Sequence, residues 1–161
     1  MNRGAVVSVN TSDGGVPKLP IREGRVGVNG VAGDRQRDLR FHGGPDRAVC
    51  LYSFEIIQAL QAEGHPIGVG SAGENLTLSG VDWGLMVPGS RVRIGTAVLE
   101  LTRYAHPCSN LVPCFRGGEF TRISQKVHPG WGRLYARVLE EGNVQAGDPV
   151  EILEKPAEAS S

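Results

Sequence analysis

The stretch His106-Pro107-Cys108 places a thiol next to an imidazole in the middle of the chain. It follows the strand-like run Val98–Thr102 and the pair Arg103-Tyr104, so a cation and an aromatic ring are close to the thiol in sequence. A cysteine reacts, or binds a metal, as the thiolate, and neighbouring positive groups favour that form. Free cysteine is also among the most buried residue types, so a small core residue is the alternative interpretation of Cys108.

Two glycine-rich loops carry further candidate groups for binding an anion. Lys18 lies in a loop with two glycines and two prolines, where it is either a solvated side chain or a cation that reaches an anionic ligand. His42-Gly43-Gly44 follows a run rich in arginine. A glycine pair can expose backbone N–H groups that form an anion-binding concavity. The alternative for this second loop is a tight hairpin with charges on the surface.

Residues 68–73 have the literal spacing G-x-G-x-x-G of a dinucleotide-binding loop. That loop needs a strand before it and a helix after it. Here His65-Pro66 precedes the glycines and a strand-like run follows them, so we reject the dinucleotide interpretation. We predict instead a flexible loop that leads to Glu74 and Asn75, which either tie the loop or hydrogen-bond a ligand. The sequence also lacks a nucleophile elbow, a P-loop and a C-x-x-C pair.

The elements that must position these residues are short and mostly extended. The 161 residues include 23 glycines and ten prolines, which implies many turns and favours a β-rich fold. The apolar spacing of Ser53–Glu63 predicts the main helix, with Ser53 as its cap. Gly95-Thr96 predicts a type II′ turn between two strands of a hairpin. Further strands are predicted at Ala5–Asn10, Arg25–Val31, Arg47–Tyr52, Leu134–Glu140 and Val150–Leu153, and a helical turn at Ser109–Phe115.

These eight to ten short strands with one main helix indicate a mainly β, barrel-like sheet. We expect a single domain over residues 1–154 and a disordered polar tail over residues 155–161. The formal net charge of zero argues against a general nucleic-acid surface. No membrane-length apolar run and no secretory signal are recognisable, so a cytoplasmic protein is expected. An odd cysteine count fits free thiols, with Cys50 in the core and Cys114 either buried or a resolving thiol.

The chain resembles the MOSC domain (molybdenum cofactor sulfurase C-terminal domain) over roughly Val6 to Leu153. The segments that carry the resemblance occur in the family's order. They are GGVPKLP at Gly14–Pro20, the turn Gly33-Asp34, HGGPDRAVCLY at His42–Tyr52, GEN at Gly73–Asn75, PCSNL at Pro107–Leu111 and GWGRLYARVLEEGNVQAGDPVEI at 130–152. The resemblance implies a strand-rich MOSC barrel and an association with the molybdenum cofactor (molybdopterin), not with pyridoxal phosphate.

The resemblance assigns the family's functional cysteine to Cys108. In a reductase of N-hydroxylated compounds this thiolate binds molybdenum, whereas in a sulfur carrier it holds a persulfide, and a soft thiolate suits both. His42 and His106 are candidates for proton transfer during a two-electron N–O reduction. The candidate cofactor-binding residues are Lys18, Arg47 and Arg103 for the phosphate, the backbone of His42, Gly43 and Gly44, and Glu74 and Asn75 for the pterin edge.

Two function classes remain open at this point. The first is an enzyme that binds molybdopterin and reduces N-hydroxylated substrates. The second is a sulfur-carrier or cofactor-delivery module without turnover of its own. The expected partners are the pterin cofactor and an external electron donor or sulfur donor protein, because the chain lacks the extra domains of larger relatives and a set of iron–sulfur cysteines. Neither nucleic acid nor a membrane is expected as a partner.

Overall fold

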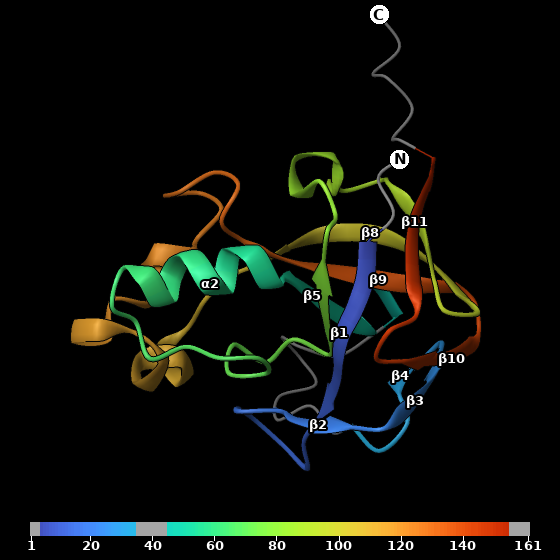
Figure 1. The fold of residues 1–161 in the computed structure, drawn as a ribbon, viewed down its shortest axis with the longest axis horizontal. Helices are drawn as coiled ribbons and strands as arrows, with labels where there is room; N and C mark the ends of the chain where they lie inside the picture. Colours follow the sequence, from blue (N-terminus) through green and yellow to red (C-terminus); the bar gives the residue numbers. More distant parts are fainter. Residues whose placement is uncertain (1–3, 35–44, 155–161) are drawn as a thin grey trace, which may run out of the picture.

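A closed sheet forms the centre of the molecule in this computed structural model, which describes residues 4–34 and 45–154. Eight strands follow one another by hydrogen bonding, and the sheet closes because β11 at one edge also pairs with β1 (Figure 1). The barrel confirms the predicted fold class. In order of pairing, the strands are β11 (Pro149–Glu154), β7 (Arg91–Ile94), β8 (Ala97–Ala105), β9 (Arg133–Glu140), β5 (Val49–Ser53), β6 (Leu76–Ser79), β1 (Gly4–Thr11) and β2 (Leu19–Ile21).

The apolar interior of the barrel comes from the two-residue alternation of its strands. On β5, Val49 and Leu51 belong to the buried core of the barrel, whereas Cys50 between them faces outward. On β9, Leu134 and Ala136 face the same core, and Tyr135 faces outward beside Cys50, its partner in the ladder. The outer face of β5 and β9 is therefore free to line a site.

A second, smaller sheet covers one part of the barrel. It contains β10 (Gly142–Gln145), β3 (Glu23–Gly27) and β4 (Gly30–Val31), in that order. The extended segment predicted at Arg25–Val31 is a hairpin rather than a single strand, because Val26 of β3 pairs with Val31 of β4 and Gly27 pairs with Gly30. The predicted turn at Gly95-Thr96 is confirmed: Ile94 pairs with Ala97, and Gly95 has a φ of 57° while Thr96 does not have a positive φ.

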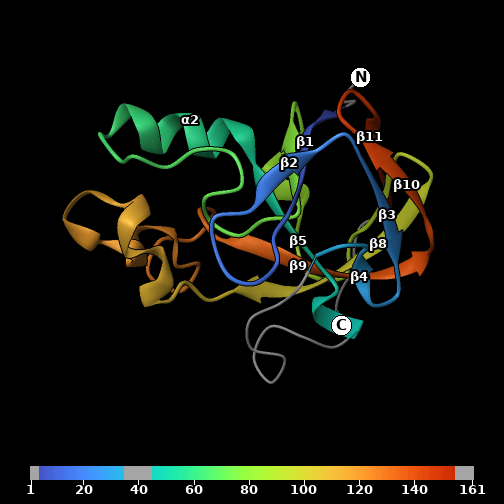
Figure 2. The ribbon, with the colours of Figure 1, turned by 90° about the horizontal axis from the view of Figure 1, so that it is seen from below.

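The main helix and the helical turns of residues 109–123 lie together on one side of the barrel (Figures 1 and 2). α2 (Phe54–Ala62) confirms the predicted helix, and the Ser53 side chain caps it by accepting a hydrogen bond from Ile56 N at 3.3 Å. α2 links the two strands that pair in parallel, β5 and β6. The short 3₁₀ helices are η1 (Pro45–Arg47), η2 (Trp83–Leu85), η3 (Ser109–Cys114), η4 (Arg116–Gly118) and η5 (Phe120–Ile123).

A second apolar core joins these helical segments to the outer face of the barrel. Ile57 and Leu60 of α2 are fully buried against Leu111, Phe115 and Ile123 of the segment that contains η3 to η5. This packing fixes the chain directly after Cys108. The helical turn predicted after Cys108 is confirmed as η3, which continues through Pro113.

The glycine-rich segment 68–73 forms turns that lead into β6, as predicted, and it does not open a helix. Gly70 has a φ of 81°, and a Cβ there would lie 2.1 Å from the carbonyl oxygen of Lys18. Lys18 N donates to Gly70 O at 2.8 Å, so the two loops are held in close contact. Only glycine allows this approach.

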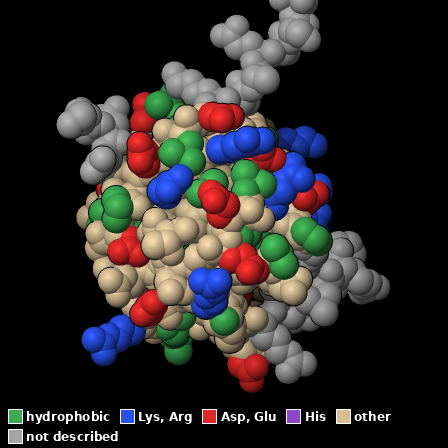
Figure 3. Space-filling view, turned by 90° about the vertical axis from the view of Figure 1, so that its right-hand side faces the viewer, with side chains coloured by type: hydrophobic (Ala, Val, Ile, Leu, Met, Phe, Trp, Pro, Cys, Tyr) green, Lys and Arg blue, Asp and Glu red, His purple; other side chains and the backbone are tan. Residues whose placement is uncertain are grey.

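The surface around β7, β10 and β11 carries acidic and basic side chains side by side (Figure 3). Ion pairs across the ladder account for part of this pattern, since Glu100 of β8 binds Arg91 on one neighbouring strand and Arg137 on the other. Within the described residues, no helix is long and apolar enough to cross a membrane. The predicted tail at 155–161 lies outside those residues.

Candidate functional site

A pocket lies against the outward faces of β5 and β9, at the point where β8 ends. Cys50, Arg133 and Tyr135 come from the two strands, and the loops at residues 15–18 and 72–75 form the opposite walls. The pocket contains about 640 Å³ of empty space, a figure that includes the open solvent at its mouth.

Cys108 and His106, the two candidate chemical residues, both line this pocket. Ala105, the last residue of β8, packs with Cys50 and Tyr135, so the strand delivers the following residues directly to the pocket. Cys108 has an extended backbone and is partly exposed, and η3 begins with the next residue. The thiol is therefore accessible from a cavity and its backbone is fixed by the packing that follows.

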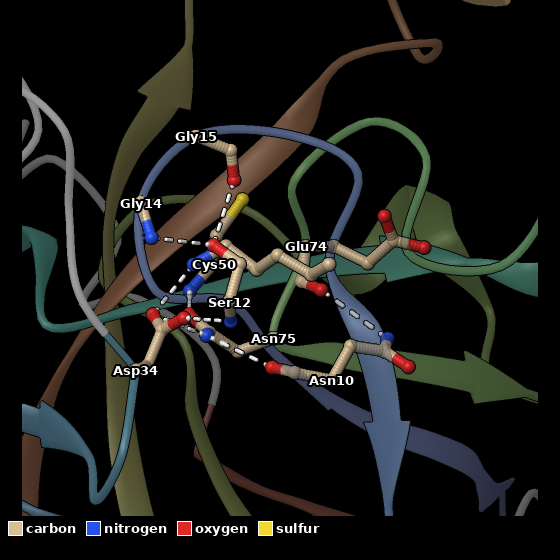
Figure 4. A network of polar contacts seen from close by, with 9 residues as sticks. Asn10, Ser12, Gly14, Gly15, Asp34, Cys50, Glu74 and Asn75 are labelled. Carbon is tan, nitrogen blue, oxygen red and sulfur yellow. Dashed lines mark hydrogen bonds and ion pairs between the residues drawn. The ribbon is translucent and has the colours of Figure 1, made fainter.

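Lys18 and Asn75 also line the pocket, so the structure brings four of the predicted residues together. Asn75 lies at the centre of a polar network (Figure 4). Its side-chain Nδ2 donates to Asp34 Oδ2 at 2.9 Å and to Asn10 O at 3.2 Å, and its Oδ1 accepts from Cys50 N at 3.0 Å. Asn75 is 1% exposed, and these bonds show that its amide is occupied by the protein itself.

Lys18 differs from the expected free cation because it is paired with a carboxylate. Its Nζ lies 2.5 Å from Asp34 Oδ2, and both side chains are almost fully buried. Asp34 also accepts a hydrogen bond from Ser12 N at 2.9 Å. The predicted turn at Gly33-Asp34 thus supplies the counter-ion that the loop lysine needs.

Three of the other predicted cofactor-binding residues, Arg47, Glu74 and Arg103, are not among the residues that line the pocket. Arg103 is exposed on β8, opposite Tyr135 in the ladder, and the Arg47 guanidinium lies 5.8 Å from the centre of the Tyr135 ring. Glu74 is completely buried behind the pocket wall. His42, Gly43 and Gly44 lie outside the described residues.

Glu74 supports the glycine-rich loop from within. Its Oε2 accepts hydrogen bonds from Gly70 N at 3.0 Å and from Thr77 Oγ1 at 2.9 Å. Its Oε1 has no hydrogen-bond partner among the described residues. Burial raises the pKa of the Glu74 carboxyl, which favours the neutral form of this group.

Sequence reasoning missed Arg133 and Tyr135 as pocket residues and assigned Cys50 to the core. Cys50 is buried as predicted, but its side chain faces the pocket, and burial raises its thiol pKa to about 11. The signal for Arg133 and Tyr135 was the alternation along β9. Both residues alternate with Leu134 and Ala136, whose side chains fill the barrel, so they face outward. Burial likewise raises the pKa of Tyr135 to about 12.

The donor set of the pocket fits a metal that a cofactor also binds. No group of three or more metal-binding side chains occurs among residues 4–34 and 45–154. The Cys108 thiol is a single soft donor at the pocket, which suits a heavy metal whose other ligands come from a cofactor. The buried cation Arg133, whose Nε has no partner within the described residues, suits an anionic group on the same molecule.

The closed barrel and the cysteine that lines a pocket on its outer face define a class of protein. It is a strand-rich β domain whose candidate site contains a thiol. The model of the MOSC domain family matches residues 38–151, which is most of the chain. The chain therefore belongs to the MOSC domain family, whose members are associated with the molybdenum cofactor.

Relatives and solved structures agree with this assignment. The chain is 36% identical over 124 residues to YflK of Bacillus subtilis strain 168, covering 76% of this chain and 55% of that protein. It is 32% identical over 135 residues to a Gibberella moniliformis protein named reductase, covering 80% of this chain and 23% of that protein. The crystal structure of YiiM from Geobacillus stearothermophilus superposes with a TM-score of 0.75 at 26% identity, covering 98% of this chain and 79% of that chain. The chain spans only about half the length of YflK and less than a quarter of the named reductase.

Proposed function

We propose that this chain binds molybdopterin and reduces N-hydroxylated compounds, with Cys108 as the thiolate ligand of molybdenum. The observation that carries the proposal is the position of Cys108, a partly exposed thiol that lines a pocket just beyond a strand end. Membership of the MOSC family and the relative named reductase support it.

The cofactor, when bound, supplies two-electron redox chemistry at its metal. The chain's own residues hold and surround it. Cys108 provides the soft donor, Tyr135 offers an aromatic face, and Arg133 provides positive charge in the wall. Asn75 fixes the wall, since its amide is bonded to the loops on both sides of it.

Reduction of an N-hydroxylated base to the amine consumes two electrons and two protons and releases water. His106 is exposed at the pocket, where its imidazole is placed to pass a proton to the leaving oxygen. The electrons come from an external donor protein, which is the partner this proposal requires.

The test is the molybdenum and pterin content of protein purified from a host that makes the cofactor. We expect about one molybdenum per chain in the wild type and its loss in Cys108→Ser. Cys114→Ser is the matched control: Cys114 lies six residues further on and is buried with its Sγ 3.3 Å from Ser71 O. This control should retain molybdenum, and it should reduce an N-hydroxylated base when a viologen supplies electrons.

The same preparation separates the enzyme from the sulfur carrier. A persulfide on Cys108 in protein that holds no molybdenum would contradict the reductase and support the carrier. If Cys108→Ser held as much molybdenum as the wild type, Cys108 would not be a molybdenum ligand.

A further inference from the structure

Arg133 is a buried cation that uses little of its hydrogen-bonding capacity. It is the first residue of β9 and lines the pocket, yet only 7% of its surface is exposed. Its Nη1 donates to Ala72 O at 2.7 Å, which is the one hydrogen bond that the Arg133 side chain makes within residues 4–34 and 45–154. Its Nε is buried and has no partner there. A guanidinium carries five N–H donors, so most of those of Arg133 are not used by hydrogen bonds to the described residues.

The charge of Arg133 also lacks a paired carboxylate among the described residues. Asp34 is bonded to Lys18, and Glu74, although close enough to interact electrostatically with Arg133, forms no ion pair with it. Burial raises the pKa of Glu74, which favours an uncharged carboxyl beside the guanidinium. Arg122, by contrast, has both oxygens of Glu63 at 2.8 and 2.7 Å. An unpaired buried cation is costly, and an anion in the pocket offsets that cost.

We propose that Arg133 forms an oxyanion-binding subsite in the wall of the pocket, which takes a phosphate monoester or a carboxylate. Guanidinium binds such groups through two parallel N–H···O bonds, and the bond to Ala72 O holds the side chain in place for this contact. The subsite replaces Lys18 as the main cation for an anionic ligand, because Lys18 already has Asp34 as its counter-ion.

Anion binding at Arg133 is independent of the proposed reaction, because it is a property of the protein without molybdenum. The experiment therefore uses full-length protein from a host that does not make the cofactor. Inorganic phosphate and acetate are titrated separately at constant ionic strength, and binding is measured by calorimetry and by the rise in melting temperature. We expect saturable binding of at least one of the two anions by the wild type, and at least about tenfold weaker binding by Arg133→Met, which keeps the length of the side chain but loses charged hydrogen bonds.

Arg137→Met is the matched control for this experiment. Arg137 lies four residues further along β9 and faces outward as Arg133 does, but it is exposed, bound to Glu100 at 2.6 Å and absent from the pocket lining. Its substitution should leave anion affinity within about twofold of the wild type. An equal loss of affinity in both variants would indicate a general charge effect and overturn the subsite.

A second variant distinguishes a loss of anion binding from a folding defect in Arg133→Met. Arg133→Lys keeps the positive charge but loses the planar pair of donors, so we expect weakened anion binding with an unchanged circular dichroism spectrum. In the wild type, the Arg133 Nε–H resonance, identified by its absence from the lysine variant, should shift as anion is added. Wild-type affinity in Arg133→Lys together with a stationary resonance would overturn the proposal, as would wild-type protein that binds neither anion.

A further arm identifies the source of the anionic group. If protein loaded with molybdopterin no longer binds added anion, the subsite is filled by the phosphate of the cofactor. If the loaded protein still binds anion, the subsite accepts an acidic group of the substrate. Either result supports an oxyanion site at Arg133, and neither depends on the reductase activity.

Discussion

Cys50 and Asn75 are joined by two hydrogen bonds that run in opposite directions. The Cys50 backbone N–H donates to the Asn75 side chain at 3.0 Å, and the Asn75 backbone N–H donates to the Cys50 carbonyl at 2.8 Å. The second contact joins the start of β6 to β5, and the first places the Asn75 amide next to the strand that carries the pocket. One asparagine therefore connects the glycine-rich loop, the barrel and the pocket wall.

Replacing Asn75 by alanine should destabilise the protein strongly. The substitution leaves Cys50 N without its acceptor and removes a donor from both Asp34 and Asn10, all in a buried network. Each buried group left unsatisfied costs about 1–3 kcal/mol, so we expect a loss of about 3 kcal/mol in the free energy of unfolding. Chemical denaturation measures this loss. Asn143→Ala, at an exposed position of β10, is the control and should change stability by less than about 0.5 kcal/mol.

The Lys18–Asp34 pair should show strong coupling between its two members. Asp34→Ala leaves a buried ammonium without its carboxylate and should cost about 3 kcal/mol in the free energy of unfolding. Adding Lys18→Met to that variant removes the unpaired charge, so the double variant should be more stable than Asp34→Ala alone. A double-mutant cycle from urea denaturation measures the coupling. Additive effects of the two substitutions would mean that the pair is not a unit.

The buried carboxyl of Glu74 should make stability depend on pH. Burial raises its pKa in the folded protein above the value of 4.5 for the free side chain, so the folded state retains the proton longer than the unfolded state. The contribution of Glu74 to stability is complete below pH 4.5 and decreases as the pH rises through the raised pKa of the folded state. Glu74→Gln is a neutral isostere and should lack this decrease, so its stability relative to the wild type should grow from pH 4 to pH 8.

The measurement for Glu74 is the free energy of unfolding across that pH range. Glu151→Gln is the matched control, because Glu151 lies on β11 and is exposed. Its difference from the wild type should be nearly constant with pH. A constant difference in Glu74→Gln as well would show that Glu74 does not retain its proton.

Much of the fold could be predicted because its signals are local. The alternation of β8, the Gly95-Thr96 turn and the capped helix after Ser53 each depend on a few adjacent residues. β2 was not predicted as a strand because its middle residue is Pro20, which placed Leu19–Ile21 in or next to a predicted loop. These residues form a strand through their pairing with β1. Short strands of this kind depend on their partner, which local sequence does not reveal.

The candidate site could be predicted only in part, for a related reason. Cys108 and His106 stand out by residue type, and both line the pocket. Arg133 enters the same pocket through the pairing of β9 with β5, a contact between segments more than eighty positions apart in the chain. The pairing of Lys18 with Asp34 is also a product of the tertiary structure. Residue type identified the chemistry, whereas the counter-ions and pocket walls depend on contacts that the sequence alone does not give.

The three thiols should differ sharply in their rates of alkylation. Cys50 is buried with a thiol pKa raised to about 11, so only about 0.1% of it is thiolate at pH 8. Burial also raises the pKa of Cys114, whereas Cys108 is partly exposed at the pocket. Iodoacetamide at pH 8 should therefore modify Cys108 at least about tenfold faster than either of the others. Peptide mass spectrometry over a time course gives the three rates, and urea-unfolded protein, in which all three should react at similar rates, is the control. Faster labelling of Cys50 than of Cys108 in the folded protein would contradict the outward placement of Cys108, and with it the basis for treating this thiol as the metal ligand.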